Sequence, residues 1–282
     1  MIIADYTLHA IETGRFGLDG GAMFGVVPRT LWSKANPPDD RNRIAMAARA
    51  LLLVGHGKKI LVDVGNGTKY DEKLRLIYGF DNHDADLLSS LKQHGLGPGD
   101  ITDVILTHLH FDHAGGSTVI VDGKAKPTFP KAQYYVQREH WRGAINPTER
   151  DRASFFPHDY LPLDQSGQLV FVEGEREILP GISVRIVNGH TTALQCPVVS
   201  DGRQTLFYCA DLMPTTSHIA LPWIMAYDLR PLVTLEEKRT ILAEALRKKW
   251  IVFFEHDPVT AAATLADSAK GIVMGEKVDI EE

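Results

Sequence analysis

Short apolar runs bounded by glycine, proline or charged residues dominate the pattern of the chain, and such runs predict β-strands. Each is four to twelve residues long and contains β-branched or aromatic side chains. They occupy residues 2–13, 47–54, 59–64, 103–106, 133–137, 169–172, 182–187, 204–209 and 250–254. The second and third of these runs are close enough to pair as a hairpin.

Two other segments carry apolar residues at helical spacing. Residues 87–94 and 234–249 fit this period, and in the second of them Thr234 and Glu237 have the spacing of a capping box. The chain therefore mixes hairpins with strand–helix units. This mixture predicts an α/β fold with two mixed β-sheets and not a single doubly wound parallel sheet.

A glycine- and proline-rich stretch covers residues 14–43, and it is longer than most loops of a compact domain. Large apolar side chains interrupt it, which argues for a folded flap and against disorder. They are Phe16, Met23, Phe24 and Trp32. Two interpretations remain open: these side chains form an apolar wall over a site, or they seal the core or a homodimer interface. No linker is visible, so we expect one domain over residues 1–282.

The composition narrows the class of protein. Of the 282 residues, 44% are hydrophobic and 23% are charged, which excludes a disordered chain or a coiled coil. The 30 basic and 36 acidic residues give a net charge of −6, which disfavours a nucleic-acid partner.

The number of cysteines and the lengths of the apolar segments predict the cellular location. Two cysteines, Cys196 and Cys209, make no disulfide framework. The chain shows neither a signal peptide at its start nor a run of about 20 apolar residues. We therefore expect a cytoplasmic protein with no membrane partner.

The strongest chemical signal is a cluster of four metal-type ligands within six residues. His108, His110, Asp112 and His113 follow directly after a predicted strand. On extended backbone, alternate residues point to the same side, so His108 and His110 can coordinate one ion together. If the chain then turns into a helix, Asp112 and His113 face a second ion. Zinc suits these donors, and manganese, iron and cobalt are alternatives.

Further ligand candidates stand at the ends of other strands. His190, Asp211 and His256 each follow an apolar run. A rigid site needs ligands collected from several elements in this way. Each of the three is a weak signal alone, because a histidine or aspartate after a strand is more often a loop or turn residue.

Taken together, these motifs resemble those of the metallo-β-lactamase superfamily. The resemblance rests on residues 61–65, the run from Thr107 to Gly116, and three later segments, in the family's order. The later segments are Gly189-His190-Thr191, Asp211 and Glu255-His256-Asp257. It implies a four-layer αβ/βα sandwich with a dinuclear metal site in the cleft between its sheets.

The resemblance also implies a role for each ligand. His108, His110 and His190 would hold the first ion, and Asp112, His113 and His256 the second. Asp211 would bridge both ions, and Asp63 would orient a ligand or a water molecule. The cofactors implied are two divalent metal ions.

Within this superfamily, the sequence is most similar to the branch of quorum-quenching acyl-homoserine lactonases and methyl-parathion-hydrolase-like enzymes. Asp211 stands where the commonest β-lactamases use cysteine. The glycine-rich stretch at residues 19–28 resembles the opening of the lactonases, which are often dimers. The chain departs from them at Pro214, where well-studied lactonases carry a tyrosine. Tyr227 and His218 are the candidates to replace it.

The function expected is hydrolysis of a small lactone or carboxylic ester by a hydroxide that bridges two metal ions. Asp112 or a metal-bound water would pass the proton to the leaving group, and Asp211 would hold the ions together. One alternative is hydrolysis of phosphotriesters at the same site. A remote alternative is a metal-binding sensor or scaffold that does not catalyse a reaction.

Overall fold

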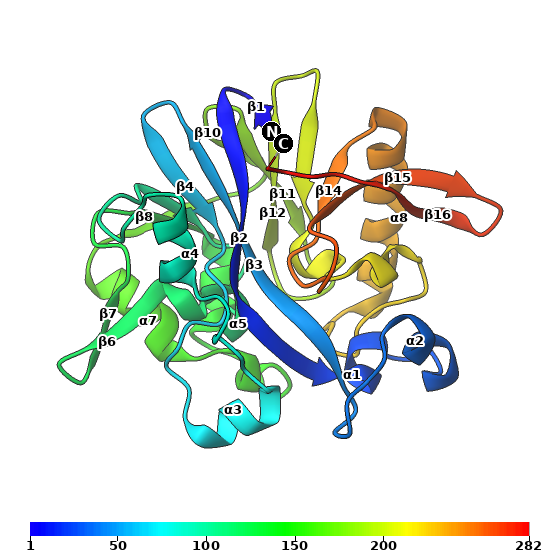
Figure 1. Cartoon of the computed structure of the whole chain (residues 1–282), viewed down its shortest axis with the longest axis horizontal. Helices are drawn as coiled ribbons and strands as arrows, with labels where there is room; N and C mark the ends of the chain where they lie inside the picture. Colours follow the sequence, from blue (N-terminus) through cyan, green and yellow to red (C-terminus); the bar gives the residue numbers. More distant parts are fainter. Residues whose placement is uncertain (282) are drawn as a thin grey trace.

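Two seven-stranded mixed sheets dominate the computed structural model, which describes residues 1–281 (Figure 1). The first sheet contains, in spatial order, β1 (Ile2–Ile3), β2 (Tyr6–Asp19), β3 (Arg43–Gly55), β4 (Lys58–Val62), β5 (Asp103–Ile105), β8 (Gln133–Gln137) and β9 (Leu169–Val172). The second contains β10 (Arg176–Leu179), β11 (Ile182–Val187), β12 (Leu194–Ser200), β13 (Thr205–Tyr208), β14 (Ile251–Phe253), β15 (Ala262–Ser268) and β16 (Gly271–Lys277). A separate ribbon pairs β6 (Thr118–Val121) with β7 (Lys124–Pro127).

Both sheets combine antiparallel and parallel pairs. Strands β4, β5, β8 and β9 run parallel, as do β13 and β14, and the remaining neighbours are antiparallel. The helices are α1 (Gly20–Phe24), α2 (Arg29–Ala35), α3 (Glu72–Tyr78), α4 (Leu87–Gln93), α5 (Phe111–Ala114), α6 (Arg138–Ala144), α7 (Pro157–Gln165) and α8 (Pro231–Lys248). Short 3-10 turns lie at η1 (Gly115–Ser117), η2 (Arg152–Ser154), η3 (Ala210–Leu212) and η4 (Thr216–Ile219).

The side-chain alternation of β3 explains the layering. Leu51 and Leu53 point into the core between the two sheets, where they join Phe207 of the second sheet. Leu52 points to the opposite face and packs in a second core with Leu91 of α4. Figure 1 shows α4 and α7 outside the first sheet and α8 outside the second. The expected four-layer αβ/βα arrangement with two mixed sheets is confirmed.

The predicted flap begins later than expected. Residues 14–19 are not a loop but the continuation of β2. This strand pairs with β3 from Tyr6 to Asp19, with one register shift between Glu12 and Gly14. Phe16 lies opposite Met46 in this register. The long pairing satisfies the backbone hydrogen bonds that a loop would have left open. Helices α1 and α2 then form the remainder of the flap region.

The predicted start of the last helix is also wrong. Helix α8 begins at Pro231, and Thr234 lies inside it instead of capping it. The Thr234 hydroxyl donates to Asp228 Oδ2 at 2.6 Å, and the Glu237 carboxylate accepts from the backbone N–H groups of residues 188 and 189. Both side chains therefore tie the helix to the loops around it.

Among residues 1–281, none of the helices combines the length and the apolar character that a membrane span requires.

Candidate metal centre

The seven ligand candidates come together at one end of the cleft between the sheets. All of them follow the carboxyl ends of strands, the edge where open α/β sheets place their ligands. His108 follows β5, and His110 is the residue before α5, which carries Asp112 and His113. The others follow three strands of the second sheet: His190 after β11, Asp211 in η3 after β13, and His256 after β14. All seven are buried.

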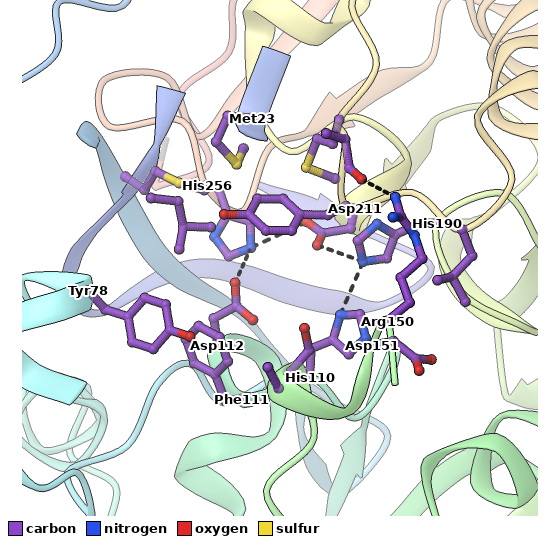
Figure 2. A pocket seen from close by; sticks show the side chains of 18 residues that line it. Met23, Tyr78, His110, Phe111, Asp112, Arg150, Asp151, His190, Asp211 and His256 are labelled. Atoms are coloured by element: carbon purple, nitrogen blue, oxygen red, sulfur yellow. Dashed lines mark hydrogen bonds and ion pairs between the residues drawn. The ribbon is translucent and has the colours of Figure 1, made fainter. Parts of the chain in front are cut away.

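The first group consists of His108, His110, His190 and Asp211, whose ligand atoms lie within 4.8 Å of one another. The Nδ1 atom of His110 is 3.0 Å from His108 Nε2 and 3.1 Å from His190 Nε2. The carboxylate of Asp211 completes the group, with Oδ2 at 3.2 Å from His190 Nε2 (Figure 2). The structure thus brings together the set that the sequence assigned to one ion.

The second group consists of Asp112, His113 and His256, again within 4.8 Å. The Nε2 atoms of His113 and His256 are 3.1 Å apart, and His256 Nε2 is 3.6 Å from Asp112 Oδ2. Asp211 lies between the two groups, because its oxygens are 3.4 Å from His256 Nε2 and 3.5 Å from His113 Nε2. Its carboxylate therefore contacts members of both groups.

The hydrogen bonds on the outer side of each ring show where the lone pairs point. His256 Nδ1 donates to Ala47 O at 2.8 Å, and His113 Nδ1 lies 3.0 Å from an oxygen of Asp63 and 2.9 Å from one of Glu255. With protons on these Nδ1 atoms, the two facing Nε2 atoms both carry lone pairs. Two lone pairs at 3.1 Å repel unless a cation lies near them.

In the first group, too, an outer hydrogen bond sets the direction of a lone pair. His190 Nδ1 donates to Asp228 Oδ1 at 2.9 Å, so its Nε2 lone pair points at His110. Asp211 Oδ1 is buried and accepts no hydrogen bond. Imidazole nitrogens and carboxylate oxygens that converge in this way are the donor set of a divalent transition ion. The residues present therefore fit two such ions.

Burial and neighbouring charges shift the pKa values of the clustered imidazoles in opposite directions. Burial, reinforced by neighbouring imidazoles, lowers the pKa of His108 and His110 well below the ordinary value. Burial also opposes protonation of His113, but the carboxylates of Glu255, Asp211 and Asp112 outweigh it and raise its pKa. Burial would raise the pKa of Asp211, yet the surrounding imidazoles lower it well below the usual range. Asp211 is thus held as a carboxylate, the form that binds a cation.

Two residues of this network were not singled out from the sequence. Asp228 orients His190, and Glu255 contacts the same His113 nitrogen as Asp63 does. Asp228 lies in a loop with no motif spacing to the other ligands, so the sequence carried no signal for it. Glu255 belongs to the segment Glu255-His256-Asp257 that carried the resemblance, but the sequence assigned it no role of its own.

Asp63 lies beside the cluster and contacts one of its imidazoles. Its two oxygens accept from the backbone N–H and the hydroxyl of Thr107, each at 2.7 Å, and one of them also contacts His113. Its backbone is in the left-handed region, with φ of 54°. Strained backbone of this kind persists only where the surrounding structure holds it, and here it lies against the metal centre.

A cavity of about 230 Å³ opens directly over the cluster (Figure 2). Its floor includes His110, Asp112, His190, Asp211 and His256. Its walls are mostly apolar and include Leu18, Met23, Met46, Phe111, Met225, Ala226 and Leu229. Polar side chains stand among them: Tyr78, Arg150, Asp151, Ser154 and Tyr227. The metal centre is therefore accessible to a small, largely apolar molecule.

The six predicted pocket residues divide into two sets. Met23 and Tyr227 line the cavity. Phe16, Phe24, Trp32 and His218 do not line it, because they are buried behind its wall. Their packing is with other aromatic rings: Phe24 stacks on Trp32 and on His218, and the Phe16 ring meets the edge of His256.

His218 also has no free nitrogen for a substrate. Its Nε2 atom lies 2.9 Å from Met23 O, and its Nδ1 atom lies 2.8 Å from the Thr215 hydroxyl. Burial lowers its pKa to about 4, so it stays neutral and joins η4 to α1.

The comparisons with known proteins agree with this geometry. A family model described as the metallo-beta-lactamase superfamily matches residues 45–256, well over half of the chain. The chain therefore belongs to the metallo-β-lactamase superfamily. The family and the fold expected from the sequence are confirmed.

Curated relatives are N-acyl homoserine lactonases. The lactonase AiiA of Bacillus thuringiensis subsp. kurstaki is 25% identical over 174 residues, which is 61% of this chain and 62% of that protein. The match thus spans less than two thirds of the length of the relative.

Solved structures match over nearly the whole chain. A probable metal-dependent hydrolase from Staphylococcus aureus is 29% identical, with a TM-score of 0.89 over 99% of this chain and 100% of that one. AidC, a dizinc quorum-quenching lactonase in complex with its product, is 22% identical, with a TM-score of 0.82 over 99% and 97% of the two chains. The second similarity shows a shared fold.

Proposed function

We propose that this chain is a dinuclear metal-dependent hydrolase of lactones or carboxylic esters. The observation that carries the proposal is the convergence of five imidazoles and two carboxylates beneath an apolar cavity. His108, His110 and His190 would hold one ion, Asp112, His113 and His256 the other, with Asp211 shared. Zinc is the ion proposed, since these donors are typical of zinc sites.

When bound, two such ions activate a water molecule as the nucleophile and polarise the substrate oxygen. The chain itself keeps the ligands in place. Asp228, the backbone oxygen of Ala47 and the pair Asp63 and Glu255 hold the outer nitrogens of three imidazoles, which fixes the inner nitrogens toward the centre. Preorganised ligands of this kind reduce the rearrangement needed during reaction.

Asp112 is proposed to move the proton to the leaving group. It lines the cavity floor, so one edge of its carboxylate faces a bound substrate. Tyr227 is proposed to contact the substrate in place of the tyrosine that Pro214 replaces. Tyr227 reaches the cavity from the loop before α8. The Pro214 carbonyl oxygen instead accepts a hydrogen bond from the backbone N–H of His256.

The shape of the walls supports an acyl substrate. Methionines at positions 23, 46 and 225 give a flexible apolar lining. A second hollow of about 730 Å³ shares Leu18, Tyr78 and Tyr227 with the catalytic cavity and continues along α3. An acyl chain that leaves the metal centre could extend into this space. The curated lactonase relatives support the same substrate class.

The test is turnover by the zinc-loaded enzyme with three substrates: N-hexanoyl-homoserine lactone, an aryl ester and paraoxon. We expect kcat/KM to be highest for the lactone or the ester. Turnover of paraoxon alone would replace the proposal with the phosphotriester alternative. No turnover of any of the three by fully loaded enzyme would favour the non-catalytic scaffold.

A further inference from the structure

A second group of potential metal ligands lies where the C-terminal segment meets the first sheet. His9 of β2, His94 at the end of α4 and Glu281 each offer one ligand atom, and these atoms lie within 4.8 Å of one another. None of the three belongs to the metal centre described above. They are far apart in sequence, so only the fold brings them together.

The carboxylate of Glu281 is already oriented. Its Oε1 atom accepts the backbone N–H of Ala10 at 2.9 Å, and its Oε2 atom lies 2.7 Å from His9 Nδ1. The ring of His94 lies beside that of His9, with centroids 4.6 Å apart. Two imidazoles and one carboxylate therefore meet at one place on the surface.

The backbone next to this cluster is held in place as well. The terminal amine of Met1 donates to Ile280 O at 2.8 Å. Figure 1 shows the C-terminal segment returning from β16 to the start of the chain. Glu281 is thus placed beside β2 by contacts that do not depend on a metal ion, which lowers the ordering cost of binding one.

We propose that His9, His94 and Glu281 form a surface site for a divalent transition ion, zinc above all, which fastens the C-terminal segment to the first sheet. Two histidines and one carboxylate are a donor set that zinc accepts. His94 and Glu281 are exposed, so an ion enters directly from solvent and keeps water on its open side. Because the ligands meet only in the folded chain, binding there stabilises the fold.

The first test counts bound zinc. Wild type, His94→Ala and Glu281→Gln are titrated with zinc against a competing indicator dye, with His83→Ala as an exposed-histidine control outside the cluster. We expect wild type and the control to bind one more ion per chain than the two variants. The difference does not depend on how many ions the catalytic centre holds. Equal numbers in all four proteins would overturn the proposal.

The second test measures the thermal unfolding midpoint of the same proteins with the catalytic centre already loaded. At a roughly fivefold excess of free zinc over the dissociation constant, we expect wild type and the control to gain roughly 2–4 °C. The two variants should gain less, and their kcat should equal that of wild type because the cluster does not line the cavity. An identical gain in all four proteins would contradict the assignment.

Discussion

Asp228 is a single residue on which the first metal group depends. One oxygen accepts from His190 Nδ1 and the other from the Thr234 hydroxyl, and the side chain is buried. The change Asp228→Asn removes the charge that favours the proton on His190 Nδ1. We expect metal affinity to fall by about 10–100-fold. Zinc competition with a chelator measures this loss.

The control for this variant is Asp267→Asn, which alters an exposed aspartate of β15. It should leave metal affinity and turnover unchanged. If both variants retained wild-type affinity, the orienting role of Asp228 would be wrong.

Lys238 is a buried lysine of α8 with an unusual set of partners. Its Nζ atom donates to the backbone oxygens of Ala220, Leu221 and Trp223 at 2.9, 3.3 and 2.8 Å. These carbonyls begin the loop that delivers residues 225–227 to the cavity wall. Lys238→Met removes this shared donor, although Ala220 O also accepts the Trp223 backbone N–H at 3.0 Å. We therefore expect a loss of about 1–3 kcal/mol in stability and a raised KM. Metal content should remain that of wild type.

The same residue gives a pH dependence. Burial lowers the pKa of Lys238 from 10.5 to about 7. Between these values the unfolded chain binds a proton that the folded chain lacks, so the contribution of this group to the free energy of unfolding rises with pH. The rise is at most about 1.4 kcal/mol per pH unit. Urea unfolding at pH 7 and pH 9 should show that the stability difference between wild type and Lys238→Met grows with pH; a constant difference would contradict it.

At this scale the sequence indicated which residues come together in the cluster better than it indicated the residues that support them. His108 to His113 form a dense motif, and its spacing alone indicates two ions. Asp228 acts through a ring nitrogen on a different loop, so its importance depends on tertiary contacts. Phe24 and Trp32 are large aromatic residues of the kind that line pockets. In the structure their rings instead stack on each other behind the cavity wall.

At the scale of elements, the turn after the ligand motif requires glycine because two segments nearly touch. A Cβ atom on Gly116 would lie 2.1 Å from Val64 O. The two segments are also joined by hydrogen bonds from Val64 N to His113 O and from Gly116 N to Gly65 O. Gly116→Ala must push them apart, so we expect about 1–3 kcal/mol of destabilisation and reduced metal binding.

Gly143 supplies a matched comparison. It lies in α6, and an added Cβ meets nothing within 4 Å. Gly143→Ala should be neutral or stabilising by about 0.4–1 kcal/mol. Equal destabilisation by both alanines, measured by urea unfolding, would show that the contact at Gly116 does not matter.

Element boundaries were harder to predict than element types. The strand character of residues 47–54 and 59–64 was clear, because local composition decides it, and β3 and β4 form the hairpin. Residues 14–19 pair with β3, which is distant in sequence. The glycines in this stretch indicated a loop instead of a strand. The capping signal at Thr234 failed because its hydroxyl has a tertiary partner.

The whole molecule is held by a core that does not include the metal ligands. The two sheets meet across apolar side chains such as Leu53 and Phe207, and a separate apolar core underlies α4. Removal of metal by a chelator should therefore abolish hydrolysis while far-ultraviolet circular dichroism stays close to that of the loaded protein. The unfolding midpoint should fall, since bound ions stabilise the folded state. Loss of the circular dichroism signal would show that the ions are needed for the fold itself.

The order of strands in each sheet could not be read from sequence patterns alone. The parallel neighbours β13 and β14 are separated by η3, η4 and α8, and no local signal pairs them. The family resemblance supplied the layered architecture. Asp211 and His256 lie near each other because this pairing aligns the ends of the two strands.

The most direct test of the dinuclear centre is an anomalous difference map from crystals of the zinc-loaded protein. The account predicts two peaks on either side of Asp211, one among His108, His110 and His190 and the other among Asp112, His113 and His256. A map with no peak in this cluster, or with a single peak there at full zinc occupancy, would contradict it.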